Sequence, residues 1–158
     1  MEFNKKVNAS PEDFYNNGMA FMEAAHRCFG NKQGNTYKLI DGGKIYILPG
    51  PTVVNAAFAC EMFFKALLRH YAISYNKVHD LYGLFKLLPE NVQSSISRFC
   101  GDKEDTTVFE RILLEQANDF KEIRYYIEKA GWTGMNPLRM ITVAYNLSQI
   151  TNVLLQNS

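Results

Sequence analysis

The feature that most constrains the fold is the segment PTVVNAAFACEMFFKALLRHY, which spans residues 51–71. Its charged residues Glu61, Lys65 and Arg69 are spaced by four, so on a helix they form one narrow stripe. Almost every other position is apolar, and a helix that is apolar nearly all round lies in the middle of a bundle or between subunits. We therefore predict a helix over about 51–72, with a Glu61–Lys65 ion pair worth roughly 0.3–0.5 kcal/mol if exposed.

Start and stop signals predict further helices on both sides of this segment. Ser10 fits an N-cap, Pro11 the first helical position, and Asp13 the acid of a capping box. Gly30 ends that first helix. Helical spacing of apolar residues predicts four more helices, over about 80–88, from Pro89 to about Cys100, over 107–130, and from Asn136-Pro137 onward.

Residues 31–50 have a different character. The runs TYKLI and KIYIL are strand-like and flank Asp41-Gly42-Gly43, a turn sequence that favours a β-hairpin. Pro49-Gly50-Pro51 is expected to separate this hairpin from the helix that follows. An isolated hairpin is marginally stable in water, so it must lean on the helices or on another subunit.

These elements predict one domain over residues 1–158. The fold class is all-α: an up-and-down helical bundle of about five helices, with a small β-hairpin inserted after the first helix. A chain of 158 residues with 47% hydrophobic residues is long and apolar enough to bury a single core.

Charge and cysteine content narrow the class of protein further. A net charge of +1 gives no strong field toward DNA or a membrane. The three cysteines, Cys28, Cys60 and Cys100, are far apart and form no Cys-x-x-Cys pair, which is typical of a reduced, cytosolic protein. Because no run approaches about 18 uninterrupted apolar residues, we expect no membrane partner.

Motifs for metal, cofactor or nucleophile chemistry are absent from the sequence. His26-x-Cys28 is the nearest approach to a metal-ligand pair, and such a pair is more often part of a packed helix. The Gly42-Gly43 turn does not lead straight into a helix, and neither Gly-x-Ser-x-Gly nor HExxH occurs. We expect no metal and no cofactor.

Two polar groupings remain as candidate sites, and the first is His79-Asp80. In the structural interpretation, Asp80 caps the helix that follows and His79 packs above it. In the chemical interpretation, the pair takes part in a reaction.

The second grouping lies within LEQANDFKEIRYYIEK in the predicted 107–130 helix. Arg124 borders the apolar stripe of that helix. It either pairs with Glu128 while Tyr125 and Tyr126 cover the rim, or it is held at a groove of the bundle to meet a phosphate.

Three quoted segments together resemble one known family. PTVVNAAFACEMFFKALLRHY, then VHDLYGLFKLLP, then FKEIRYYIEK are similar to the HEPN (higher-eukaryote and prokaryote nucleotide-binding) superfamily of helical domains. The resemblance covers about half the chain, roughly residues 51–129. Its landmarks here are Glu61, Lys65, His79 and Asp80, for which we expect structural roles.

The resemblance implies a helical bundle that dimerises through its central helices, and a working context among RNA-cutting toxins, antiphage effectors and nucleotide- or RNA-binding proteins. The family's ribonucleases carry an arginine followed shortly by a histidine that transfers protons. Arg124 fits the arginine, but Lys129, Ala130 and Gly131 occupy the positions for histidine. We therefore expect a cytoplasmic, non-catalytic homodimer that binds RNA or a nucleotide, in a phage-defence or toxin–antitoxin context.

Two other functions stay open. The first is a divergent, metal-independent ribonuclease that uses Arg124 with Lys129 or Glu128 in place of the histidine. The second is a protein–protein interaction module that binds a protein partner through the hairpin at 36–48 and flat helical faces, without affinity for nucleic acid.

Overall fold

The structure of the protein is a computed structural model, which describes residues 8–30, 37–38, 44–45, 49–123 and 136–157. For residues 37–38, 44–45, 49 and 117–123 only the backbone is described. The described residues form six helices and two very short strands. In chain order these are α1 Pro11–Phe29, β1 Tyr37–Lys38, β2 Lys44–Ile45, α2 Pro49–His70, α3 Leu81–Lys86, α4 Glu90–Cys100, α5 Thr107–Ile123 and α6 Pro137–Gln156.

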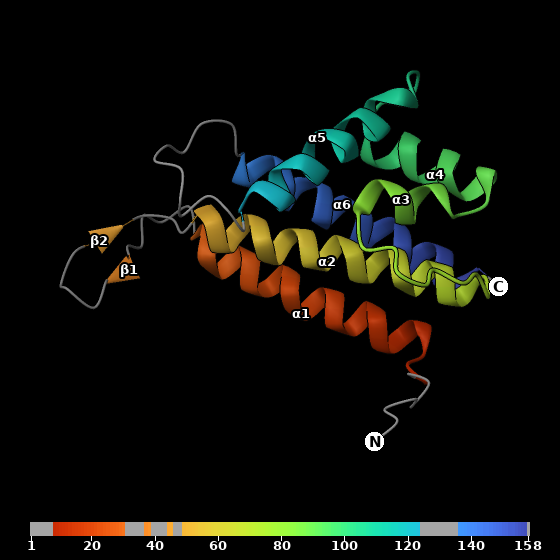
Figure 1. The fold of residues 1–158 in the computed structure, drawn as a ribbon, viewed down its shortest axis with the longest axis horizontal. Coiled ribbons are helices and arrows are strands. Elements are labelled where there is room, and N and C mark those ends of the chain that lie inside the picture. The colour runs from red at the N-terminus through yellow and green to blue at the C-terminus, as the bar shows by residue number, and fades with distance from the viewer. Residues whose placement is uncertain (1–7, 31–36, 39–43, 46–48, 124–135, 158) are drawn as a thin grey trace.

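Helix α2 lies in the middle of the bundle. Phe63, Phe64 and Leu67 are fully buried, and α2 contacts α1 and α6 most extensively and also contacts α3 and α5. Figure 1 shows α1 and α2 running side by side in opposite directions, with α3 to α5 on the far side of α2. Of the two environments predicted for this helix, burial within its own bundle is therefore the one observed.

The apolar composition of α2 also gives it the length and hydropathy of a candidate membrane span. The segment Gly50–His70 reaches a mean hydropathy of 1.3 over an 18-residue window, and 72% of that window is buried inside the bundle. Its apolar side chains therefore have a place in the core of this chain, which accounts for their number without a lipid environment.

Local capping signals set the ends of several helices as predicted. The Ser10 hydroxyl accepts the backbone N–H of Asp13, and the Asp13 carboxylate accepts the backbone N–H of Ser10, which completes a capping box. Asn136 caps α6 in a similar way, by accepting the backbone N–H of Arg139 at 3.0 Å. Gly30 ends α1 with a φ of 84°, a conformation that favours glycine.

The start of α2 differs from the prediction. The helix begins at Pro49, so Pro49-Gly50-Pro51 forms its first turn and does not separate it from the preceding segment. The prediction of a break there was wrong. The physical reason is that the first N–H groups of a helix have no partner inside the helix, so proline is tolerated in that turn.

The all-α class is confirmed, whereas the β-hairpin is not. Within the described residues, Tyr37 pairs with Ile45 and Lys38 with Lys44 in an antiparallel register. A ladder of two residues on each side is too short to establish the predicted hairpin over 31–50, most of which lies outside the described residues. The predicted end of the 107–130 helix also lies outside them, since α5 is described only to Ile123.

Candidate functional site around Glu61, Lys65 and His79

The charged stripe of α2 contains a buried ion pair. Nζ of Lys65 lies 2.6 Å from Oε1 of Glu61, and the two side chains are 11% and 8% exposed. The predicted pair is therefore formed, but the free energy expected for an exposed pair does not apply to it. Two charges removed from water lose hydration, which their mutual attraction must offset.

His79 adds a second nitrogen to the same carboxylate oxygen. Its Nδ1 lies 3.2 Å from Oε1 of Glu61, although the His79 side chain is 74% exposed. An ionised carboxylate can only accept, so a hydrogen bond from His79 to such a carboxylate requires the hydrogen on Nδ1. The prediction that His79 packs above α3 was wrong, because its ring stays largely in solvent.

The other residues of the stripe join α2 to neighbouring segments. Lys65 lies over the ring of Tyr75, with Nζ 5.6 Å from the ring centroid. Partial burial raises the pKa of Tyr75, while the nearby charge of Arg69 acts in the opposite direction. Nε and Nη2 of Arg69 donate to the backbone carbonyl of Ala9, at 3.2 and 3.1 Å. The stripe thus connects α2 both to the 71–80 segment and to the residues that precede α1.

Asp80 caps α3, as the sequence predicts. Its Oδ1 accepts the backbone N–H of Gly83 at 2.6 Å. A Cβ at position 83 would lie 2.7 Å from Oδ2 of Asp80 and 3.0 Å from Cγ1 of Val78, so a larger residue there would require the Asp80 carboxylate to move. The Asp80 carboxylate is therefore committed to the start of α3, which is a structural role.

The chemical capacity of this cluster is limited to hydrogen bonding and proton transfer at His79. Among the described residues, no group of three histidine, cysteine, aspartate or glutamate side chains could hold a metal ion. Burial raises the pKa of the Cys60 thiol, and it raises that of Cys100 to about 12. Both thiols are thus neutral near pH 7 and are poor nucleophiles.

The predicted phosphate-binding residues belong to a different part of the chain. Arg124, Tyr125, Tyr126, Glu128 and Lys129 all lie outside the described residues. Their proposed role therefore stays a prediction.

Glu115, which belongs to the same sequence segment, is among the described residues. Oε2 of Glu115 on α5 lies 2.7 Å from Nη1 of Arg139 on α6, so this acid pairs across two helices. Glu115 thus links α5 to α6 through a partly exposed ion pair.

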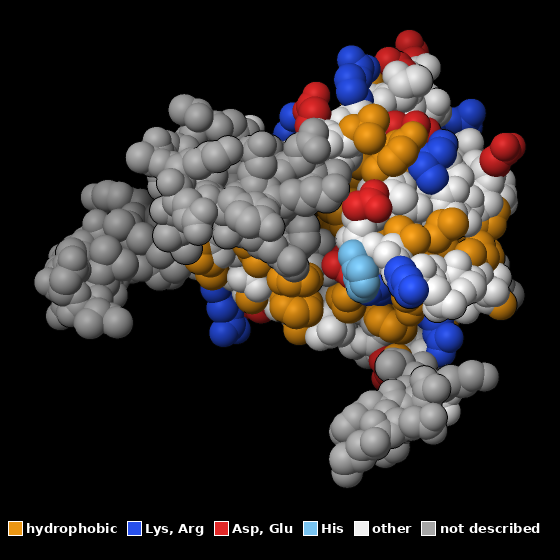
Figure 2. Space-filling view, in the orientation of Figure 1, with side chains coloured by type: hydrophobic (Ala, Val, Ile, Leu, Met, Phe, Trp, Pro, Cys, Tyr) orange, Lys and Arg blue, Asp and Glu red, His pale blue; other side chains and the backbone are white. Residues whose placement is uncertain are grey.

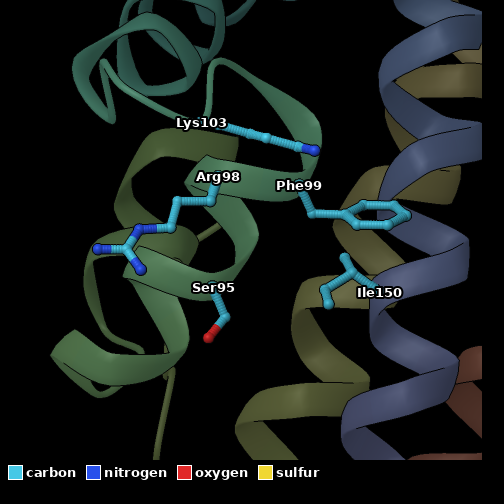
Figure 3. A pocket seen from close by; sticks show the side chains of 5 residues that line it. All are labelled: Ser95, Arg98, Phe99, Lys103 and Ile150. Atoms are coloured by element: carbon cyan, nitrogen blue, oxygen red, sulfur yellow. The ribbon is translucent and has the colours of Figure 1, made fainter.

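A surface hollow lies in a region that the sequence did not single out. It measures about 620 Å³ and is lined by Ser95, Arg98 and Phe99 of α4, Lys103 of the following loop, and Ile150 of α6 (Figure 3). The sequence signal was the apolar Phe99, which follows the charged Arg98 and lies off the apolar stripe of an amphipathic helix. That signal alone does not reveal that Ile150 lies nearby.

The surface charge is mixed in the view of Figure 2. Lysine and arginine side chains alternate with aspartate and glutamate over the described part of that face, without one continuous patch of a single sign. This distribution agrees with the net charge of +1. Any binding of a phosphate group on this face would depend on a few local cations, because no broad field gathers anions there.

No protein-family model, curated protein or solved structure matches this sequence. Membership of the HEPN superfamily therefore stays a prediction from the residues quoted above.

Proposed function

We propose that this chain is a HEPN-like helical module that binds RNA or a nucleotide without cleaving it. The observation that carries the proposal is the cluster of Glu61, Lys65 and His79. These landmark residues come from α2 and from the segment before α3, and they meet around one carboxylate oxygen. Glu61 and His79 are 18 positions apart in the sequence and yet in contact. Residues that match a motif by chance would not be expected to contact each other, so this contact supports a shared architectural role.

The cluster is proposed to shape the binding module and not to carry its chemistry. Glu61 joins α2 to the segment that leads into α3, and Asp80 then starts α3. The ligand contacts are assigned to Arg124, Tyr125, Tyr126, Glu128 and Lys129. A guanidinium binds phosphate oxygens in a bidentate manner, and tyrosine rings stack on bases.

The proposed homodimer needs a surface other than α2, because the apolar residues of α2 are used inside its own bundle. Helix α6 offers an alternative. Leu138, Tyr145 and Val153 are large, exposed and spaced so that they lie toward one side of that helix. Exposed apolar residues of this kind support self-association through α6, in the predicted defence or toxin–antitoxin context.

The experiment that tests the ligand is a binding titration of the purified protein with labelled single-stranded RNA and with nucleotides, without added metal. Arg124→Ala is expected to weaken binding by roughly tenfold or more, since a charge-assisted contact to phosphate contributes about 1.5–3 kcal/mol. Arg111→Ala is the matched control, because Arg111 is an exposed α5 arginine that faces Asp105 at 3.7 Å.

Two results would contradict the proposal. Wild-type protein that binds neither RNA nor nucleotide, but captures a protein through residues 36–48, would support an interaction module. Equal affinity in the wild type and Arg124→Ala would remove Arg124 from the site.

A divergent ribonuclease is the second candidate, and the geometry of His79 favours it. An exposed imidazole with Nδ1 on a buried carboxylate keeps Nε2 available for proton transfer. Incubation with total RNA and a metal chelator tests this function. Cleavage that leaves 2′,3′-cyclic phosphate ends and disappears in both His79→Asn and Arg124→Ala would favour the enzyme. If the RNA stays intact, the result would favour a module that binds RNA without cleaving it.

A further inference from the structure

The hollow beside α4 combines an uncovered aromatic ring with local positive charge. Helix α4 buries Val92, Ile96 and Cys100 against the bundle, and these residues repeat every four positions. Phe99 lies off that face and is 51% exposed, next to the partly buried Ile150 of α6. One exposed aromatic residue is ordinary on a protein surface. Phe99 lies in a shallow hollow of about 620 Å³ that is largely open to solvent, and this volume is large enough for a small ligand.

The cations at the rim have no acidic partner among the described residues. Six ion pairs are recorded in that part of the chain, and neither Arg98 nor Lys103 belongs to one. Two of the three acids of the adjoining loop are held by local hydrogen bonds, although each keeps its negative charge. Oδ1 of Asp102 accepts the backbone N–H of Glu104 at 2.8 Å, and Asp105 bonds Thr107. The Glu104 side chain remains as an exposed carboxylate of the same loop.

The two cations are not equivalent. In Figure 3 the Lys103 side chain extends toward the side where Phe99 and Ile150 lie, whereas the Arg98 guanidinium points away on the opposite side of α4. A ligand seated on the Phe99 ring would therefore meet the Lys103 ammonium first. Arg98 contributes only a more distant positive charge, which solvent and salt screen.

We propose that this hollow binds a nucleotide unit. Its base would stack on the Phe99 ring and contact Ile150, and its phosphate would lie at Lys103. An aromatic face accepts any base, and an adjacent unpaired ammonium holds a phosphate as a point charge. The site shares the ligand class of the proposed function but uses none of the same residues. It stands or falls independently of Arg124.

The experiment measures the affinity of the full chain for labelled oligoadenylate RNA, with unlabelled adenosine monophosphate and inorganic phosphate as competitors. Phe99→Leu keeps an apolar side chain but removes the ring, and it should weaken binding by at least about fivefold, the lower end of a base-stacking contribution. Phe99→Tyr should retain most of the affinity. Lys103→Gln should weaken binding several-fold, whereas Arg98→Gln, which removes the same charge, should have a clearly smaller effect.

The competitors identify the source of the nucleotide unit. Displacement of the RNA by adenosine monophosphate at similar concentrations indicates a free nucleotide, and displacement only by other oligomers indicates one unit of a single strand. Displacement by inorganic phosphate alone, with Phe99→Leu unaffected, would overturn the stacking proposal. Wild-type affinity in Phe99→Leu and Lys103→Gln would overturn it too, as would the absence of binding by the wild type. If only Arg124→Ala weakens RNA binding, the result would support the site assigned to Arg124 and would reject the hollow at Phe99.

Discussion

Oε1 of Glu61 lies 2.6 Å from Nζ of Lys65 in α2, the most apolar of the long helices that the structure describes, and both side chains are almost completely buried. Nδ1 of His79 reaches the same oxygen from the segment before α3. The carboxylate is thus shared by two nitrogens from separate parts of the chain. Breaking a buried pair leaves one charge without compensation, so we expect the loss of either Glu61 or Lys65 alone to reduce stability.

Lys65→Met is expected to destabilise the protein by about 3–5 kcal/mol, because it leaves the Glu61 carboxylate buried without its ammonium partner. The double variant Glu61→Leu/Lys65→Met should recover much of that loss, since it removes both charges. Urea unfolding followed by circular dichroism measures the difference.

The exposed pair of Glu23 and Arg27 is a matched control for this prediction. It has the same i,i+4 spacing, with an N–O distance of 2.9 Å, but its side chains are largely exposed. Glu23→Gln should change the free energy of unfolding by less than about 0.5 kcal/mol. If Lys65→Met lowers the free energy of unfolding by no more than Glu23→Gln does, burial does not make the protein more sensitive to the loss of the Glu61–Lys65 pair.

Gly18→Ala is expected to destabilise the contact between α1 and α2. A Cβ at position 18 would lie 2.6 Å from Cε1 of Phe63, whose ring is fully buried and cannot move freely. The clash should cost about 1–3 kcal/mol, more than the gain of up to about 1 kcal/mol that alanine brings to a helix. Thermal and urea unfolding measure whether Gly18→Ala lowers the free energy of unfolding. Asn16→Ala, at an exposed position of the same helix, is the control.

A second variant identifies the cause of that loss. In a Phe63→Leu background, which removes the ring, Gly18→Ala should cost clearly less than it does in the wild type. Equal costs in the two backgrounds would mean that the Phe63 ring does not set the limit at Gly18.

The features that the sequence predicts correctly are those set by neighbouring residues. The Ser10–Asp13 capping box and the Asp80 and Asn136 caps each depend on positions three residues apart, so the local pattern is enough to recognise them. The central place of α2 also follows from its own composition. The break at Pro49-Gly50-Pro51 was misjudged because proline is compatible with both a linker and a first helical turn.

The site depends on contacts that a local pattern does not contain. The burial of Glu61 and Lys65 results from the segments packed around α2, which convert an apparently solvent-facing stripe into a shared polar cluster. The exposure of His79 depends on the path of the chain between α2 and α3. The hollow at Phe99 requires α4 to pack beside α6, so residues 95–103 and Ile150 had no visible relation in the sequence.

The Asp13 carboxylate predicts a pH dependence at the start of α1. Hydrogen bonds from the backbone and side chain of Ser10 hold the pKa of Asp13 below 3.8. Because the pKa is lower in the folded state, the stabilisation is present above the unfolded value and is lost as the pH falls through the folded value. An NMR titration of the carboxyl carbon should therefore give a midpoint below 3.8.

Ser10→Ala separates the two causes of that shift. It removes the hydroxyl but keeps the backbone N–H, so the midpoint for Asp13 should rise only part of the way to its ordinary value. Loss of the cap should also destabilise the protein by about 1 kcal/mol. A midpoint that does not move would mean that the hydroxyl makes no contribution.

The three cysteines should differ in their reactivity toward a disulfide reagent at pH 8. The pKa of Cys100 is raised to about 12 and that of Cys60 is raised as well, and both thiols are buried. Cys28 is only partly buried. The native protein is therefore expected to react quickly with about one equivalent of the reagent.

Cys28→Ser should abolish that fast phase, while denaturant should expose every remaining thiol. Fast labelling of Cys100 in the folded variant would contradict the burial of the last turn of α4.

Truncation of Asp80 is expected to destabilise the protein clearly more than truncation of its neighbour His79. Asp80→Ala removes the acceptor for the Gly83 N–H and should destabilise the protein by about 1 kcal/mol, whereas Asp80→Asn should cost little because asparagine caps equally well. His79→Ala should change the free energy of unfolding much less, since its ring is mostly in solvent and Glu61 keeps its contact with Lys65. Urea unfolding of the three variants measures these differences. A larger loss in His79→Ala than in Asp80→Ala would mean that the histidine, and not the cap, holds α3 to the bundle.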